Sequence, residues 1–377
     1  MSETRSSKPR VAVLFGGQSG EHQVSCATAA SVLASIDRDR YDVIPIGITP
    51  DGAWVRVPDD PSLYEMRAGQ GAVIEAGNKS VSLWAGTSSL VERGGRIVDG
   101  EPLAIRDLGN IDVVFPLLHG PYGEDGTIQG LFESHGVRYV GCGVASSAIC
   151  MDKHLAKTVL LAAGIAVGRW TLITDHLWTS DRARAIAQAM SVGSDLYVKP
   201  VRAGSSLGIT HVTDLDTLGD AIEHAREHDP RVIVEKAVHG REIECGVLDY
   251  GLGKQPQASE CGEISVRGSG FYDYKTKYQA HDSVTLSCPA DISHDLKHRI
   301  QEIAVDAFLA LGCEGLARVD FFYDEANDAL ILNEVNTLPG FTPWSMYPTM
   351  WEASGMHYGD LITHLIELAL HRRAGLR

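Results

Sequence analysis

The chain opens with a hydrophobic pattern that is typical of a βαβ unit. Residues 10–15, "RVAVLF", form a continuous apolar run of the kind found in buried parallel strands. A Gly-rich turn, an Ala-rich helical run to Ile36 and a second apolar strand, "YDVIPIGIT", follow. A third buried strand, "IDVVFPLLHG", precedes the loop "GPYGEDGTIQG" and a short helix. We predict an open parallel sheet that ends near residue 145, with its loops at the carboxyl ends of the strands.

Three further stretches complete the pattern. Residues 56–106 alternate only weakly and are rich in glycine, so we interpret them as an insertion. From Asp152 a helix runs to Gly164, and the segments "DLYVKPVRAGSSLGIT" and "RVIVEKAVHGREIECGVL" then predict antiparallel strands. A later helix carries one apolar stripe that ends before Gly312, with members Ile292, Leu296, Ile300, Ile303, Ala307 and Leu311.

The hairpin at residues 318–340, "RVDFFYDEANDALILNEVNTLPG", places polar side chains among apolar ones. If its strands pair symmetrically about Asn327, Asp320 opposes Glu334 and Arg318 opposes Asn336, all on one face. Facing carboxylates repel, so a cation is expected between them. Oxygen ligands without Cys or His suit Mg²⁺ or Mn²⁺, and a bridging Glu suits two ions about 3.5–4 Å apart. The hairpin alone leaves open a structural ion pair with Arg318.

The sequence contains no G-x-x-x-x-G-K-[ST], so a nucleotide would need another phosphate-binding loop. The segment "VKPVRAGSSLG" offers one, because Lys199 ends a strand and small residues follow, whose backbone N–H groups and hydroxyls can contact phosphate oxygens. These small residues are Gly204, Ser205, Ser206 and Gly208. An ordinary Gly/Ser turn is the alternative interpretation.

Three other charged residues are candidates for nucleotide contacts. Lys153 lies at a predicted helix start, where the helix dipole disfavours a cation, and a phosphate contact would explain it. Glu235 and Glu242 flank a strand end and could accept hydrogen bonds from an adenine amino group or ribose hydroxyls. Taken singly, the lysine could be solvated and the two glutamates could be surface charges.

Composition narrows the class of protein. A length of 377 residues, with 44% hydrophobic and 22% charged residues, suggests two or three globular domains. The net charge of −16 gives no basic surface for nucleic acid or an anionic membrane, so an anionic substrate would need local cations or metal. Seven cysteines without a C-x-x-C pair argue against both a disulfide framework and a zinc site. The polar start predicts no signal peptide, and we expect a cytoplasmic protein.

Eight segments, in this order, resemble the D-alanine:D-alanine ligase family of the ATP-grasp superfamily. They are "GGQSGEHQVS", "HGPYGEDGTIQG", "MDKHLAK", "VKPVRAGSSLG", "EKAVHGREIE", "FYDYKTKY", "RVDFF" and "NEVNTLPGFTPWS", and they span nearly the whole chain. The resemblance implies a multidomain α/β and α+β protein, in which a Rossmann-like open parallel domain precedes a two-lobed ATP-grasp fold. The implied domains are residues 1–145, a central lobe at 146–237 and a C-terminal lobe at 238–377 with the metal site and a mobile loop.

The resemblance also implies an activity. In that family ATP phosphorylates the carboxylate of one D-alanine, and the amine of a second D-alanine attacks the acyl phosphate. The product, D-alanyl-D-alanine, serves peptidoglycan precursor synthesis. ATP as a substrate, two Mg²⁺ or Mn²⁺ ions and a homodimer are implied with it.

Roles for individual residues follow from the same resemblance. The implied ATP contacts are Lys153, Lys199, Ser205, Glu235, Lys236, the backbone near Val238, Glu242 and Lys277. The implied metal ligands are Asp320, Glu334 and Asn336. Arg318 and the Gly340 N–H group would stabilise the transferring phosphate and the oxyanion.

The implied substrate contacts carry structural alternatives. Glu21 would anchor the ammonium of the first D-alanine, although an acid in a first helical turn is also favourable for the helix dipole alone. His119 would lie near the first substrate or be a structural histidine. Ser345 would bind the carboxylate of the second substrate or form a turn. Tyr278 would close a lid over Ser205 and Glu21 and favour the dipeptide product.

Three other functions compete with this interpretation. A D-alanine:D-lactate ligase, or a ligase for other D-amino acids, would have the same fold. A nucleotide-binding regulator would keep the fold without turnover, which intact Glu21, Arg318 and Glu334 argue against. A dinucleotide oxidoreductase is disfavoured, because "GGQSGEH" is not G-x-G-x-x-G and the next strand lacks a ribose-binding acid.

Overall fold

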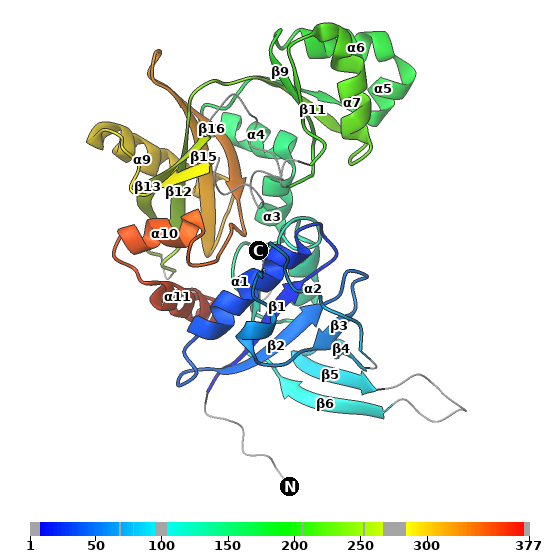
Figure 1. The fold of residues 1–377 in the computed structure, drawn as a ribbon, viewed down its shortest axis with the longest axis vertical. Coiled ribbons are helices and arrows are strands. Elements are labelled where there is room, and N and C mark those ends of the chain that lie inside the picture. The colour runs from blue at the N-terminus through cyan, green and yellow to red at the C-terminus, as the bar shows by residue number, and fades with distance from the viewer. Residues whose placement is uncertain are drawn as a thin grey trace.

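The N-terminal part of the molecule is built on a mostly parallel sheet (Figure 1). The computed structural model describes residues 8–67, 69–77, 79–94, 104–204, 207–251, 253–266 and 284–372. Its first sheet has the strand order β3-β2-β1-β7, with β2, β1 and β7 parallel and β3 antiparallel at the edge. These strands are β1 (Arg10–Gly16), β2 (Asp42–Ile48), β3 (Trp54–Arg56) and β7 (Val113–Pro116). The predicted open parallel sheet is therefore confirmed, with one antiparallel edge strand.

Helices and a small second sheet complete this part of the chain. They comprise α1 (His22–Ser35), η1 (Pro61–Leu63), β4 (Lys79–Leu83), β5 (Ser89–Gly94), β6 (Ala104–Asn110) and α2 (Thr127–Ser134). The insertion predicted at 56–106 contributes to an antiparallel sheet of order β4-β5-β6. This sheet lies beside the edge of the first sheet, away from the rest of the molecule (Figure 1).

The central part carries an antiparallel sheet of order β10-β9-β11-β8. Its elements are α3 (Val144–Met151), α4 (Lys153–Ala162), β8 (Trp170–Ile173), α5 (Asp175–Ser180), α6 (Arg182–Met190), β9 (Leu196–Pro200), β10 (Thr210–Val212), η2 (Leu215–Thr217), α7 (Leu218–Arg226) and β11 (Val232–Lys236). Asp152 caps α4 by accepting a hydrogen bond from the Leu155 N–H group. The antiparallel strands predicted here are confirmed.

The C-terminal part carries an antiparallel sheet of order β14-β13-β12-β15-β16. Its elements are β12 (Arg241–Leu248), β13 (Gln257–Val266), β14 (Val284–Ser287), α9 (His294–Ala310), β15 (Leu316–Asp324), β16 (Ala329–Asn336), α10 (Met346–Ala353) and α11 (Tyr358–His371). The predicted apolar stripe packs on this sheet through α9, where Leu296, Ile300 and Ala307 are buried. Ile292 precedes the helix, because Ser293 caps it.

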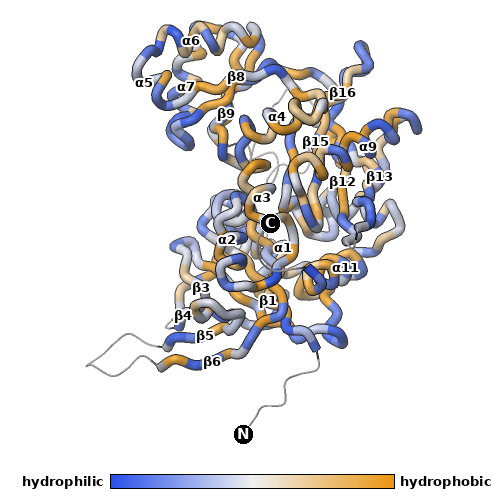
Figure 2. Tube along the Cα trace, turned by 180° about the vertical axis from the view of Figure 1, so that it is seen from behind, coloured by the Kyte–Doolittle hydropathy of each residue, from blue (hydrophilic) through white to orange (hydrophobic). Residues whose placement is uncertain are grey.

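One hydrophobic core joins the two ends of the chain. Side chains of β1 and α1 pack with Leu361 and Leu365 of α11, so the last helix completes the first domain. Figure 2 shows the hydrophobic stretches along β1 and β15, inside the molecule. In the described part of the chain, no helix combines the length and apolar character needed to span a bilayer. The boundaries at 145 and 237 lie between the sheets and stay predictions.

Candidate active site

A buried cluster of two lysines and one glutamate lies on the central sheet and α4. Glu235 on β11 is 6% exposed, and its Oε2 accepts a hydrogen bond from Lys199 Nζ at 2.6 Å. Lys157 Nζ of α4 lies 3.1 Å from Oε1. Although burial alone would raise the pKa of Glu235, the charges of Lys157 and Lys199 lower it to about 2. Glu235 is therefore not a surface charge.

Lys153 begins α4 and faces the Gly-rich segment. Its Nζ donates to the Ala203 carbonyl at 2.6 Å, and its backbone N–H donates to Val201 O at 3.2 Å. Burial lowers the pKa of Lys153, and the charge of Glu334 opposes that shift. The same burial acts on Lys199, but Glu235 outweighs it and the pKa of Lys199 is raised. Lys153 is half-buried and hydrogen-bonded to the Gly-rich segment, so it is not a freely solvated lysine.

The chain crosses from the central sheet to the C-terminal sheet between β11 and β12. Lys236 ends β11 with an exposed side chain, while its N–H donates to Arg169 O at 2.9 Å. Val238 lies in the crossing, and Glu242 follows at the start of β12 with a half-buried side chain. The predicted adenine and ribose contacts thus fall on the connection between the two sheets.

The polar hairpin has the predicted register at its site end. Asp320 pairs with Glu334, and Arg318 pairs with Asn336. Beyond them the register shifts, so that Phe321 opposes Leu332 and Asn333 is left as an extra residue. The expectation of one uniform pairing about Asn327 is therefore wrong for the outer half of the hairpin. The bulge changes the register without separating the four polar residues.

Arg318 holds the acids of this face together. Its Nε and Nη2 donate to the two oxygens of Asp320 at 2.7 and 2.8 Å, and Nη2 lies 3.2 Å from Glu244 Oε1. Asn336 Nδ2 donates to Asp320 Oδ2 at 2.9 Å. Burial would lower the pKa of Arg318, but Asp320, Glu244 and Glu334 raise it. The ion pair left open by the sequence is present, and Glu334 also acts electrostatically on both phosphate-facing lysines.

Loops from two domains meet at Glu21. Gly120 has φ +75°, and a Cβ atom placed on it would lie 2.9 Å from Glu21 Oε2. A Cβ atom on Gly204 would lie 3.4 Å from the same oxygen and 4.0 Å from the Gly120 Cα. Glu21 is thus held between the loop after β7 and the Gly-rich segment after β9, at the carboxyl ends of strands.

His119 and Glu124 connect the loop beside Glu21 to the hairpin. His119 is buried, and its Nδ1 hydrogen-bonds the Leu338 carbonyl at 3.1 Å. Burial lowers the pKa of His119, which favours the neutral ring. The Gly120 N–H donates to Glu124 Oε1 at 2.6 Å, while burial and the charges of Glu21 and Glu334 raise the pKa of Glu124 to about 8. The charges of Glu21 and of Glu334 on the hairpin therefore both act on the Glu124 carboxyl group.

The loop after β16 carries the predicted site residues Gly340 and Ser345. A Cβ atom on Gly340 would lie 3.1 Å from Ser345 Oγ, and the Thr342 N–H donates to that oxygen at 3.1 Å. Ser345 precedes α10 without a side-chain capping bond, because its hydroxyl is also 2.7 Å from Thr342 Oγ1. The predicted turn and the half-buried hydroxyl are both present. Beside them, Trp344 is 68% exposed.

Some predicted site residues lie outside the described part of the chain, and three residues of the site were not predicted. Ser205, Lys277 and Tyr278 lie outside the described residues. Lys157, Glu124 and Glu244 are the residues that sequence reasoning missed. Lys157 follows Lys153 by one helical turn, and that spacing could have indicated it. Glu124 lies within "HGPYGEDG", but only tertiary contacts show its proximity to Glu334.

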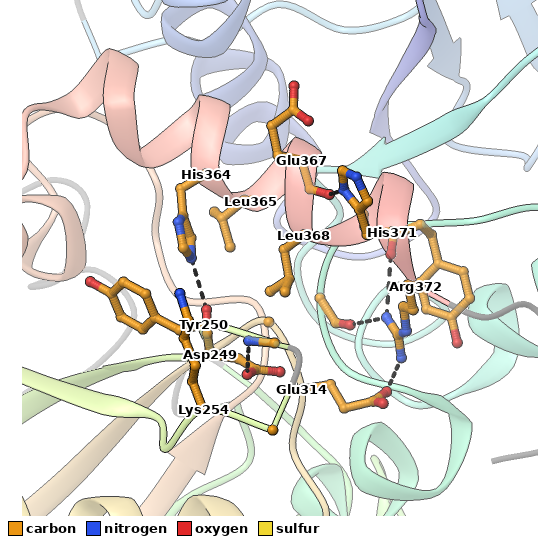
Figure 3. Close-up of a pocket in the computed structure, with 16 residues that line it drawn as sticks. Asp249, Tyr250, Lys254, Glu314, His364, Leu365, Glu367, Leu368, His371 and Arg372 are labelled. Atoms are coloured by element: carbon orange, nitrogen blue, oxygen red, sulfur yellow. Dashed lines mark hydrogen bonds and ion pairs between the residues drawn. The ribbon is translucent and has the colours of Figure 1, made fainter.

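A cavity of about 490 Å³ lies elsewhere, between α11 and the loop after β12. Figure 3 shows several of its polar side chains, among them His364 and Arg372, bonded to protein groups. His364 Nε2 hydrogen-bonds the Asp249 carbonyl at 2.8 Å, and Arg372 pairs with Glu314. The predicted site residues that the structure describes do not line this cavity. These contacts support a structural role at the junction of the first domain and the C-terminal sheet.

Comparison with known proteins agrees with this geometry. Residues 10–142 match the family model "D-ala D-ala ligase N-terminus", and residues 159–367 match "D-ala D-ala ligase C-terminus". A D-alanine--D-alanine ligase of Pseudarthrobacter chlorophenolicus is 50% identical over 375 residues, which cover 98% of this chain and 96% of that protein.

Two solved structures are similar over almost the whole chain. The VanG D-Ala:D-Ser ligase of Enterococcus faecalis has a TM-score of 0.79 and 36% identity, covering 96% of this chain and 99% of that one. A D-alanine--D-alanine ligase of Bacillus anthracis, complexed with ATP, has a TM-score of 0.69 and 27% identity, covering 97% and 98%. Together with the matched family models and the 50% identical relative, these similarities show that the chain belongs to the D-alanine:D-alanine ligase family.

Proposed function

We propose that this chain joins two D-alanine molecules to D-alanyl-D-alanine with ATP, for peptidoglycan precursor synthesis. In the first step a carboxylate oxygen of one D-alanine bonds to the γ-phosphorus of ATP, and the bond to the β-phosphate oxygen breaks, releasing ADP. In the second step the amine nitrogen of another D-alanine bonds to the acyl carbon. The bond from that carbon to the phosphate oxygen then breaks, phosphate leaves, and the nitrogen loses a proton.

For the first step, the protein would position ATP and neutralise its charge. Lys153 and Lys199 would contact the α and β phosphates, since Lys153 Nζ contacts the Gly-rich segment and Glu334 of the hairpin acts electrostatically on both ammonium groups. Lys236, the backbone near Val238, and Glu242 would hold adenine and ribose at the crossing between the sheets. Glu235 would also contact the adenine or ribose of ATP. Its ion pairs with Lys157 and Lys199 support a second role, in which it holds the two lysine side chains in position.

The hairpin fits two divalent cations. Asp320, Glu334 and Asn336 offer oxygen donors at adjoining positions of one strand pair. This hard donor set suits Mg²⁺ or Mn²⁺, as we propose. Bound there, the ions would neutralise phosphate charge during transfer. Arg318, already oriented by Asp320, would contact the transferring phosphate.

For the second step, the protein would hold both amino acids and stabilise the oxyanion. Glu21 would bind the ammonium of the first D-alanine, with His119 beside it, and Ser345 would bind the carboxylate of the second. The Gly340 N–H group and Arg318 would stabilise the tetrahedral oxyanion. Ser205, Lys277 and Tyr278 keep their proposed roles in phosphate contact and lid closure by family resemblance alone. A homodimer and a cytoplasmic location are proposed on the same basis.

One observation carries this assignment: the loop after β7 connects Glu21 to the hairpin, because Gly120 lies against Glu21 and the neighbouring His119 Nδ1 hydrogen-bonds the Leu338 carbonyl at 3.1 Å. The proposed ammonium anchor of the first substrate and the proposed metal ligand therefore face one space, as transfer of phosphate to that substrate requires. The curated relative at 50% identity is a D-alanine--D-alanine ligase, so a D-lactate product is not favoured.

The assignment is tested with purified protein, ATP, Mg²⁺ and D-alanine. We expect D-alanine to accelerate phosphate release and the dipeptide to accumulate in equal amount. We expect both signals to stop when Mg²⁺ is removed with a chelator and to return with Mn²⁺. Phosphate release that D-alanine does not accelerate would refute the assignment. Parallel reactions with D-serine and D-lactate measure selectivity for the second substrate.

A further inference from the structure

A separate group of potential metal ligands lies at the end of α7, outside the proposed active site. Among the described residues, His224, Glu227 and His228 bring one ligand atom each within 4.8 Å of one another. The backbone continues past α7 in a helical turn, because the Glu227 N–H donates to Glu223 O and the His228 N–H donates to Ala225 O, both at 3.2 Å. The three side chains therefore share one face.

The donor atoms of this group are accessible. All three side chains are exposed. His224 Nδ1 lies 3.6 Å from Glu227 Oε2, and the two imidazole rings are 5.8 Å apart at an interplanar angle of 83°. These separations leave room for an ion between the three donors.

The electrostatic surroundings favour a cation. The carbonyl end of a helix carries partial negative charge. The guanidinium of Arg226, within the same helical turn, donates to the Pro230 carbonyl at 2.9 Å and to Asp175 at 2.7 Å. Arg226 is therefore held by groups outside the ligand face.

We infer that His224, Glu227 and His228 bind a divalent transition-metal ion of the zinc class. Two imidazoles and one carboxylate suit Zn²⁺, Co²⁺ or Ni²⁺, whereas Mg²⁺ prefers oxygen donors. The order H-x-x-E-H also occurs in zinc hydrolases, where an enclosed cleft holds a substrate. Here the ligands are exposed, so the inference concerns ion binding alone. The spacing of the seven cysteines bears only on zinc sites with thiolate ligands. It does not bear on a site made of two histidines and one glutamate.

The position of the group connects it to the nucleotide half of the molecule. A Cβ atom on Gly208 would lie 2.4 Å from His228 Cδ2, so the imidazole packs directly against the Gly208 backbone. Gly208 ends the Gly-rich segment proposed to contact phosphate. The inferred ion would thus be bound beside the base of that segment.

The inference is tested by calorimetric titration of the full chain with Zn²⁺, in excess Mg²⁺ so that the oxygen site is filled. We expect a binding event in the wild type that H224Q/H228Q lacks. The matched control is H294Q/H298Q, which removes a histidine pair of the same spacing on α9, with ring centroids 4.4 Å apart. This control should keep the event.

Co²⁺ provides a second readout, because ligand-field absorption reports nitrogen coordination. E227Q should weaken Zn²⁺ binding by about tenfold, equivalent to about 1.4 kcal/mol, while leaving the imidazole bands of bound Co²⁺. Thermal unfolding of each variant checks that these exposed substitutions leave the fold intact, and H224Q alone serves if the double variant unfolds. Identical Zn²⁺ titrations of wild type and H224Q/H228Q would overturn the inference.

Discussion

At the scale of single residues, the site depends on buried charges that neutralise one another. Glu235 lies between Lys157 and Lys199, and Arg318 lies between Asp320 and Glu244. Removing one member of such a group leaves a buried charge without compensation, which costs about 3–5 kcal/mol. An exposed ion pair is worth about 0–1 kcal/mol. The two arrangements should therefore respond differently to substitution and to pH.

Glu235→Gln is expected to lower the free energy of unfolding by about 3–5 kcal/mol at neutral pH. Because the folded state lowers the pKa of Glu235 from 4.5 to about 2, its contribution is present above pH 4.5 and is lost as the pH falls toward about 2. The difference between wild type and variant should therefore shrink across this window. Urea unfolding at a series of pH values measures it.

Asp59→Asn is the matched control for that experiment. Asp59 is 43% exposed in its side chain and pairs with the similarly accessible Arg38. Its substitution should cost less than about 1 kcal/mol. A Glu235 variant with the same small cost, or with a cost that does not depend on pH, would contradict the electrostatic account of the lysine cluster.

Arg318→Lys is expected to reduce kcat by about 100-fold, because a lysine keeps the charge but cannot form both bonds to Asp320 while contacting phosphate. The KM for ATP should change much less. Steady-state phosphate release gives both constants. Arg299→Lys provides the control, since Arg299 makes an exposed pair with Asp328. Unchanged kcat in the Arg318 variant would remove this residue from the chemical step.

At the scale of elements, turns at the ends of strands position the substrate groups. Gly120 follows β7 in a left-handed conformation and lies against Glu21, which belongs to the turn before α1. In the hairpin β15–β16, the sequence predicts the strand pairing at the end that carries the polar residues. It does not predict the bulge at Asn333. The alternation of side chains predicted the pairs at Asp320 and Arg318. The register shift beyond these pairs depends on packing against neighbouring strands, and the sequence of the hairpin alone carries no information about that packing.

Gly120→Ala separates the cost of backbone strain from the cost of displacing Glu21. Both Gly120→Ala and its control Gly136→Ala force alanine to a positive φ, at a cost of about 1–2 kcal/mol. The added Cβ would lie 2.9 Å from Glu21 Oε2 in Gly120→Ala, whereas it would meet nothing within 4 Å in Gly136→Ala. We expect similar losses of stability but a higher KM for D-alanine only in Gly120→Ala. Equal KM values would argue against the role of Glu21.

At the scale of the whole molecule, the site exists because three parts of the chain are held together. Glu21 and His119 come from the N-terminal part around the first sheet, Lys153 and Lys199 from the central part, and the hairpin from the C-terminal part. The last helix, α11, packs into the core around β1 and so ties the end of the chain to its beginning.

Leu365→Ala tests this connection. Leu365 is 1% exposed, so its truncation should lower the free energy of unfolding by about 2–5 kcal/mol. Leu309→Ala, at a position 50% exposed on α9, should change it by less than about 0.5 kcal/mol. Chemical denaturation compares the two variants. Equal effects would mean that α11 contributes little to the N-terminal core.

Local pattern predicted much of the fold but not the contacts between parts. The runs at 10–15 and the stripe through Leu296 and Ile300 predicted buried elements, since burial imposes the period of the element. The same pattern was too weak at 56–106 to predict the sheet there. The proximity of Glu124 to Glu334 and the pairing of Glu235 with Lys157 depend on tertiary packing, so sequence spacing could not predict them.

We propose that a D-alanyl phosphate forms and is then attacked by the amine of the second D-alanine. This central claim is tested most directly with D-alanine labelled with ¹⁸O in its carboxylate, in a reaction with unlabelled ATP. If the carboxylate oxygen bonds to the γ-phosphorus and leaves with it, the released phosphate must carry one ¹⁸O atom for each dipeptide formed. Phosphate without label, or label that stays entirely in the dipeptide, would contradict the account.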